Sequence, residues 1–84
     1  MSKYDFVKKK KIFDNYFCKI LKIRDKKKIN SSISNCDEWD SLNHLNIMFK
    51  LENVFNCKLL NKEIKILNNY KKIITCVKKK TSLK

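Results

Sequence analysis

The stretch EWDSLNHLNIMFKLENVF, residues 38–55, holds the hydroxyl group most suggestive of covalent chemistry in this chain, that of Ser41. Asp40 precedes it, and His44, the only histidine, follows three residues later. A catalytic serine needs a general base and an oxyanion hole, and the sequence contains no G-x-S-x-G elbow that would expose such a nucleophile. We therefore expect no enzyme activity and assign no catalytic residue, and we expect His44 to be a partly buried packing residue.

Ser41 instead occupies a position that favours a phosphate group. Asp40 is well placed as the N-cap of a helix, because its carboxylate can accept hydrogen bonds from the first free backbone N–H groups. The positive end of the helix dipole and these N–H groups attract negative charge. Two interpretations of Ser41 stay open at this point: a simple residue of the helix start, or a hydroxyl that carries a phosphate-containing group.

The distribution of charge separates this stretch from the rest of the chain, whose formal net charge is +13. Residues 1–29 hold eleven basic and three acidic side chains and residues 58–84 hold nine and one, so each end has a net charge of +8. Residues 30–57 hold one basic and four acidic side chains, a net charge of −3. Ser41 therefore lies in a negative segment of a strongly basic chain.

Clustered lysines can bind a phosphate backbone, but two compositional features weaken a nucleic-acid interpretation. Arg24 is the only arginine, although arginine reads bases better than lysine does. Glycine, proline and alanine are absent while lysine, asparagine and isoleucine abound, which favours a general drift toward lysine at surface positions. We expect no nucleic-acid partner.

The size of the chain, 84 residues, predicts a single domain over residues 1–84 with a core at about 4–80, because so short a chain has apolar surface for one modest core. No apolar run is long enough to cross a bilayer, and the charged N-terminus lacks the apolar run of a secretory signal. We expect a cytoplasmic protein without membrane insertion. The widely spaced cysteines predict free, mostly buried thiols and no zinc site; they are Cys18, Cys36, Cys57 and Cys76.

The spacing of apolar residues must locate the helices, because glycine and proline are absent. It predicts a long amphipathic helix from about Lys3 to Leu21, an irregular connection over residues 22–39, and a second helix that ends at about Phe55. The apolar stripe of the first helix consists of Phe6, Val7, Phe13, Tyr16, Phe17, Ile20 and Leu21.

Asparagines mark the expected ends of the later helices. Asn56 can take the left-handed C-cap conformation after the second helix. Asn61 is expected to cap a short third helix within residues 57–67, and Asn68 or Asn69 to cap the last one. The sequence thus predicts an all-α fold, a four-helix bundle with a long loop between the first and second helices and a short third helix.

The second helix has two apolar faces when it is projected at about 100° per residue. The broad face consists of Ile47, Met48, Leu51, Val54 and Phe55. The narrow face consists of Leu42, Leu45 and Phe49. Either both faces are buried between neighbouring helices, or the narrow one is partly exposed as a docking strip for partner proteins.

The segment WDSL, residues 39–42, followed by LENVF, residues 51–55, resembles the acyl carrier proteins. The mid-chain position of the motif, the long loop before it and the order of helices after it make the match fairly specific, and it covers about residues 4–80. The resemblance implies a bundle of acyl-carrier type in which Ser41 carries 4′-phosphopantetheine through a phosphodiester. The arm ends in a thiol that holds acyl groups as thioesters while separate enzymes act on them.

The resemblance also implies partners and site residues. The partners are a phosphopantetheinyl transferase and acyl-activating, acyl-transferring or condensing enzymes, which meet the carrier as a monomer. Asp40 and Leu42 flank the attachment site, and the residues implied in partner docking are Asp37, Glu38, Leu45, Phe49 and Glu52. The pathway implied is fatty-acid synthesis or a specialised acyl, polyketide-like or surface-glycan route.

The chain departs from the family in its charge. Family members are usually acidic along the second helix, whereas here Glu52 is offset by Lys50. Asparagines stand where further acids could be, at Asn43, Asn46 and Asn53. Two alternatives remain: a small basic helical module that binds nucleic acid or an anionic membrane, and a carrier-like fold that has lost its prosthetic group and acts as an interaction subunit.

Overall fold

This computed structural model describes residues 3–30 and 36–81, without the side chain of Lys26. The regular structure of these residues consists of four α-helices and one short 3-10 helix. In chain order they are α1 (Lys3–Ile20), η1 (Lys26–Lys28), α2 (Ser41–Phe55), α3 (Asn61–Ile66) and α4 (Tyr70–Lys80). No strand occurs in these ranges, so the prediction of an all-helical bundle is confirmed. None of the described helices combines the length and the apolarity needed to cross a membrane.

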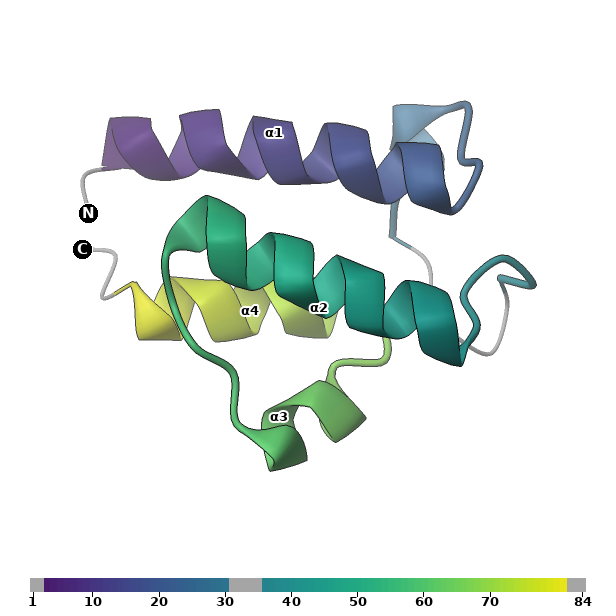
Figure 1. Cartoon of the computed structure of the whole chain (residues 1–84). Coiled ribbons are helices and arrows are strands. Elements are labelled where there is room, and N and C mark those ends of the chain that lie inside the picture. The colour runs from purple at the N-terminus through teal and green to yellow at the C-terminus, as the bar shows by residue number, and fades with distance from the viewer. Residues whose placement is uncertain (1–2, 31–35, 82–84) are drawn as a thin grey trace.

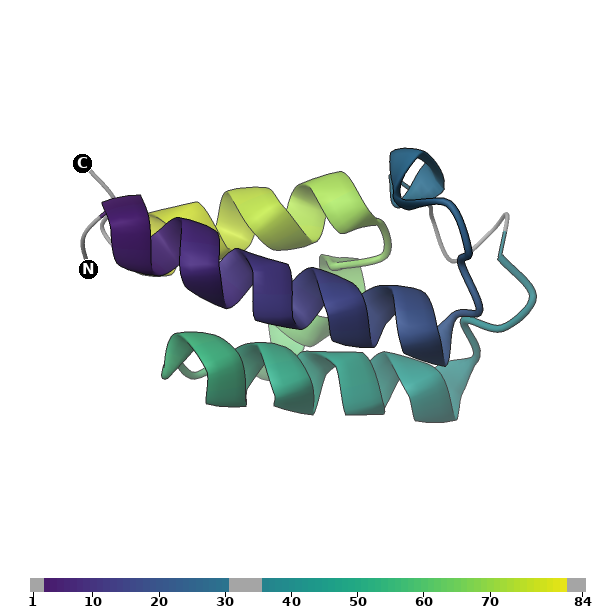
Figure 2. The ribbon, with the colours of Figure 1, turned by 90° about the horizontal axis from the view of Figure 1, so that it is seen from above.

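The three long helices lie side by side, and the short α3 lies on the side of α2 and α4 that faces away from α1 (Figure 1). Seen from above, α1 runs between α2 and α4, which flank it on either side (Figure 2). The chain direction of α2 and α4 is opposite to that of α1. Because of this topology, the start of α1 and the end of α4 lie at one end of the molecule, and the start of α2 lies at the other.

The ends of α2 are fixed by the two residues that the sequence predicts. The Asp40 carboxylate accepts a hydrogen bond of 2.8 Å from the backbone N–H of Asn43, as an N-cap does. Asn56 adopts the left-handed conformation, with φ 50° and ψ 51°, and its N–H donates to the carbonyl oxygen of Glu52. Asparagine tolerates this conformation better than most residues because its short polar side chain relieves part of the steric cost.

The N-cap of α4 is the residue predicted from the sequence, whereas the N-cap of α3 is not. Asn69 caps α4, because its side-chain oxygen accepts from the N–H of Lys72 at 2.8 Å. The expected cap at Asn61 is wrong, since Asn61 is already the first residue of α3 and Leu60 is the N-cap. The Glu63 carboxylate accepts from the N–H of Leu60 at 2.8 Å, and this contact fixes the helix start with an apolar residue at the cap.

The core is built from one face of each long helix. Phe6 and Phe13 of α1 lie 5.5 Å and 6.4 Å from Phe55 of α2, measured between ring centroids. Ile73 and Val77 of α4 are fully buried in the same cluster. Burying side chains of this size stabilises the fold by roughly 1.5–3 kcal/mol each, which exceeds what helix propensity alone contributes.

Two details of the predicted core are wrong. Val7 is 59% exposed and belongs to the solvent face of α1, although the predicted stripe included it. Of the four cysteines only Cys18 is buried, and the other three are half-buried, so the thiols are free but not mostly buried. Within the described residues no group of histidine, cysteine and carboxylate side chains is arranged to hold a metal ion.

A polar contact between α1 and α4 closes the side of the core. The Tyr70 hydroxyl donates to one oxygen of Asp14 at 2.7 Å, and the Lys10 ammonium donates to the other at 2.8 Å. Burial is the main cause that raises the pKa of Tyr70 to about 12; the contact with Lys10 opposes the rise, and the hydrogen bond to Asp14 adds to it. Burial on its own lowers the pKa of Lys10, but its hydrogen bonds with Asp14 and Tyr70 outweigh that effect and raise it.

This contact predicts a loss of stability at high pH. The pKa of Tyr70 is raised in the folded state above its usual 10.0, so the stabilisation is fully present below pH 10 and is lost as the pH rises toward 12. We expect the free energy of unfolding, measured by urea titration, to fall more steeply over this range in the wild type than in Tyr70→Phe. Tyr4→Phe, which changes a 75% exposed tyrosine, is the control and follows the wild type. Parallel curves for wild type and Tyr70→Phe would contradict the assignment.

Candidate functional site

The chain is anchored two residues before Ser41 by the burial of Trp39. The Trp39 side chain is only 3% exposed, and its ring meets that of Phe17 edge-on with a centroid distance of 5.4 Å. A backbone hydrogen bond of 3.0 Å from Trp39 to the carbonyl of Cys36 closes a turn on its N-terminal side. Asp40 and Ser41 follow directly and are exposed, so the buried indole fixes where the exposed hydroxyl lies.

His44 connects this anchor to two helices. The indole N–H of Trp39 donates to Nδ1 of His44 at 3.0 Å, and the two rings stack with a centroid distance of 6.0 Å. Nε2 of His44 lies 2.6 Å from the carbonyl oxygen of Ile64 in α3. A carbonyl oxygen can only accept, so these partners assign the proton of a neutral imidazole to Nε2 and leave Nδ1 as the acceptor.

The expected packing role of His44 is confirmed, but its two hydrogen bonds were not predicted. No sequence signal marks them, because Trp39 and Ile64 lie five and twenty residues away. Both ring nitrogens are occupied, so neither is available as a general base for the Ser41 hydroxyl.

The first turn of α2 uses its polar groups to hold the helix start in place. Besides the cap contact with Asn43, the backbone carbonyl of Asp40 accepts from the N–H of His44 at 2.8 Å. The side-chain amide of Asn43 donates to the carbonyl oxygen of Glu38 at 2.6 Å. Ser41 is the first residue of this fifteen-residue helix, at the end where the helix dipole and the unpaired N–H groups favour an anion.

The narrow apolar face of α2 is exposed. Leu42 is 68%, Leu45 44% and Phe49 57% exposed, so the alternative in which neighbouring helices bury this face is wrong. The broad face contributes to the core instead, through Ile47, Met48, Leu51 and Phe55, with Val54 half-buried. Leu42, Leu45 and Phe49 thus form an exposed apolar strip along one helix next to Ser41, and its role in docking stays a prediction.

The acidic residues of the sequence prediction separate into two groups. Asp37, Glu38 and Asp40 lie on the segment that leads into α2, next to Ser41. Glu38 is within 3.8 Å of Lys22 in an exposed ion pair, a kind of contact that contributes little to stability. Their implied role in docking stays a prediction.

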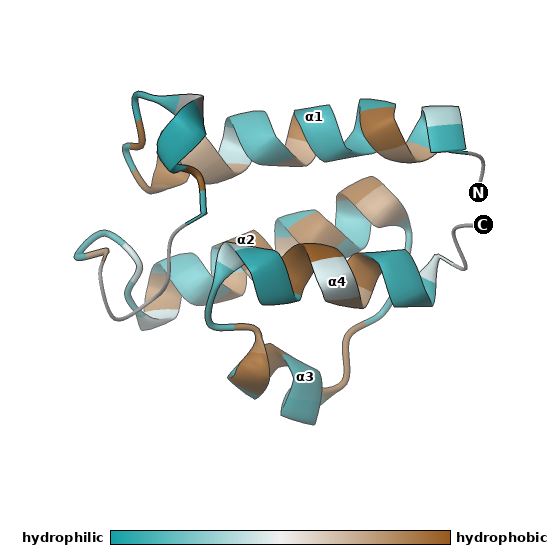
Figure 3. Cartoon of the chain, turned by 180° about the vertical axis from the view of Figure 1, so that it is seen from behind, coloured by the Kyte–Doolittle hydropathy of each residue, from teal (hydrophilic) through white to brown (hydrophobic). Residues whose placement is uncertain are grey.

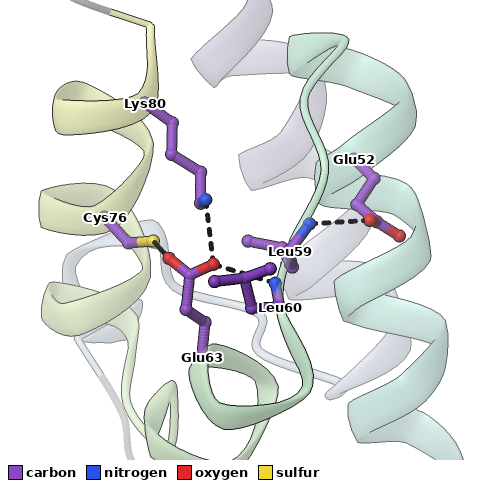
Figure 4. Close-up of polar contacts among 6 residues, drawn as sticks. All are labelled: Glu52, Leu59, Leu60, Glu63, Cys76 and Lys80. Atoms are coloured by element: carbon purple, nitrogen blue, oxygen red, sulfur yellow. Dashed lines mark hydrogen bonds and ion pairs between the residues drawn. The ribbon is translucent and has the colours of Figure 1, made fainter.

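Glu52 lies at the opposite end of α2 and has a structural partner. Its carboxylate accepts a hydrogen bond of 2.9 Å from the backbone N–H of Leu59 (Figure 4). This contact ties the link between α2 and α3 to the end of α2. The structure therefore does not bring Glu52 together with the acids near Ser41, and its implied docking role also stays a prediction.

Comparisons with known proteins assign no family to this chain: no family model, curated protein sequence or solved structure matches it. The residues that the structure brings together at one end of the molecule are the anchor Trp39, the cap Asp40, the exposed Ser41 and the start of the apolar strip at Leu42.

The bridge through His44 predicts a coupled change in stability and fluorescence. His44→Ala leaves the buried indole N–H of Trp39 without its acceptor, which costs about 1–3 kcal/mol of unfolding free energy. We expect the emission of Trp39, the only tryptophan, to shift to longer wavelength in the folded variant. The side chain of His44→Gln can still donate and accept hydrogen bonds, so this variant loses less unfolding free energy. Asn46→Ala on the same helix is the control. Unchanged stability and emission in His44→Ala would contradict the bridge.

Proposed function

We propose that this chain is an acyl carrier protein with a bundle of acyl-carrier type, and that Ser41 carries 4′-phosphopantetheine. The observation that supports this most strongly is the combination at the start of α2. Ser41, whose side chain is exposed, is the first residue of a capped helix. The buried anchor Trp39 lies two positions before it, and the exposed apolar strip begins at the next residue. A serine that served only the helix start would require neither the strip nor the exposure.

The residues present fit the group in three respects. The Ser41 hydroxyl is accessible, so a modifying enzyme can reach it without unfolding the helix. The N-terminal end of α2 stabilises a nearby negative charge by roughly 0.3–1 kcal/mol, which favours a phosphodiester there. The Asp40 carboxylate accepts a hydrogen bond from the N–H of Asn43. It thus holds the helix end in place and leaves the Ser41 hydroxyl free.

The chemistry required of the chain is attachment and presentation. In the loading step the Ser41 oxygen forms a bond to the pantetheine-linked phosphorus of coenzyme A, adenosine bisphosphate leaves, and the hydroxyl proton passes to a base of the transferase. When bound, the arm supplies a terminal thiol that holds an acyl group as a thioester. Tethering then raises the effective concentration of that acyl group at each partner.

The surface around Ser41 supports docking of the implied partners, a phosphopantetheinyl transferase and the acyl-activating, acyl-transferring or condensing enzymes. Leu42, Leu45 and Phe49 supply the apolar part of a contact. Asp37 and Glu38 supply negative charge beside it, at the end of the molecule away from the lysine-rich end of α4. A partner with a basic rim around an apolar patch would therefore meet this end of the carrier first.

Loading of Ser41 is tested by mass spectrometry. We expect the wild type, incubated with coenzyme A and a broad-specificity phosphopantetheinyl transferase, to gain the mass of one phosphopantetheine. Ser41→Ala keeps the helical circular dichroism spectrum but gains nothing, because the accepting oxygen is missing. Thr75→Ala removes an exposed hydroxyl from α4 and is the control that still gains one group. A wild type that stays unmodified, or a loaded Ser41→Ala, would overturn the proposal.

A further inference from the structure

A groove of about 580 Å³ lies between α3 and α4, on a part of the surface that the carrier proposal does not use. The residues that line it come from α3, from α4 and from the link between them. The apolar part of its lining, its floor, consists of Leu67, which is buried, Cys76, which is half-buried, and Ile66, which is 59% exposed. The end of α3 that leads toward α4 is correspondingly hydrophobic (Figure 3). The groove thus offers apolar surface that another molecule can cover.

The rim of the groove is positively charged. Lys71, Lys72 and Lys79 line it, and all three are exposed. Within the described residues none of them forms an ion pair, and the ammonium of Lys72 donates to the neutral side chain of Asn68, at 3.3 Å. The charges of the rim are therefore not compensated by the chain itself.

The one carboxylate of the groove, Glu63, is already occupied (Figure 4). One of its oxygens lies 2.8 Å from the ammonium of Lys80 and accepts from the N–H of Leu60, and the other accepts from the thiol of Cys76 at 3.5 Å. The hydrogen bond from Lys80 is the main cause that lowers the pKa of Glu63 below its usual value. Glu63 is thus ionised but neutralised by Lys80, and it does not offset the three lysines of the rim.

The spacing of these lysines indicates the size of the occupant. Lys71 and Lys79 are eight positions apart on α4, and at 1.5 Å per residue their backbones are separated by about 12 Å. Thr75 lies between them, and its hydroxyl donates a hydrogen bond of 2.9 Å to the backbone carbonyl of Lys71. A single small anion reaches one end of this rim. A polypeptide with carboxylates about two helical turns apart reaches both ends and places apolar side chains on the floor between them.

We propose that this groove binds an acidic segment of a partner protein, one that presents apolar side chains between two groups of carboxylates. Charge complementarity and the apolar floor carry the proposal, because each feature alone would fit many occupants. The proposal does not depend on Ser41. It gives the chain a second docking surface, whose charge is opposite to that of the acidic segment before α2.

The test uses a fluorescent helical peptide with two glutamate pairs about two turns apart and leucines between them. We expect saturable binding in fluorescence anisotropy, weakened roughly tenfold or more by the double variant Lys72→Glu, Lys79→Glu. Ile66→Ser, which changes an exposed floor residue, weakens it as well. The matched control Lys11→Glu, Lys27→Glu changes the net charge equally at two exposed positions elsewhere and leaves the affinity within about twofold. A peptide with glutamine in place of glutamate does not bind.

Three results would overturn the proposal. The first is that the peptide shows no saturable binding. The second is that the rim and control variants weaken the affinity for the peptide equally, which would show general attraction to a basic protein. A single-stranded oligonucleotide that binds more tightly than the peptide, and loses affinity in the same rim variant, would assign the groove to nucleic acid. Ser41→Ala binds the peptide like the wild type, so failure here and failure of the carrier proposal are separate outcomes.

Discussion

The packing of Trp39 against Phe17, together with its hydrogen bond to His44, determines where the chain turns into α2. His44 extends this contact to the backbone of Ile64 in α3. Three helices are therefore joined at the level of one indole ring. The exposed residues that follow, Asp40 and Ser41, take their position from it. For the phosphate-bearing arm that we propose on Ser41, the buried tryptophan would hold the attachment point in place.

The charges of the molecule are arranged by the topology as much as by the composition. The start of α2, with its acidic lead-in segment, lies at the end of the molecule opposite to the lysine-rich end of α4. The groove of α3 and α4 adds a positive rim whose one acid, Glu63, is paired with Lys80. The net charge of +13 is therefore a sum over surfaces of opposite sign, the acidic segment before α2 and the positive rim of the groove.

The sequence predicted the features that depend on local rules. Asp40, Asn56 and Asn69 act as caps because side-chain hydrogen bonding and left-handed geometry are properties of a few neighbouring residues. The exposure of Phe49 with the rest of the apolar strip was one of two open alternatives, because projection shows two faces but not which one a neighbour covers. Exposure of Val7 depends on how far α2 and α4 wrap around α1, which one helix cannot reveal.

Other features were missed because they join distant segments. The bridge from Trp39 through His44 to Ile64, like the groove between α3 and α4, forms only when separate helices meet. Asn61 was predicted as a cap by residue type, but the Glu63 carboxylate can reach back to the N–H of Leu60, an apolar residue. Residue type locates a helix end to within one position, and the contact decides the rest.

We propose that Ser41 carries a phosphopantetheine arm in the cell. The most direct measurement is tandem mass spectrometry of the protein purified from the cells that produce it naturally, with fragmentation of the peptide that contains residues 38–55. We expect that this peptide carries phosphopantetheine and that the fragments place it on Ser41. A peptide found only in its unmodified form, or one modified at another residue, would overturn the proposal.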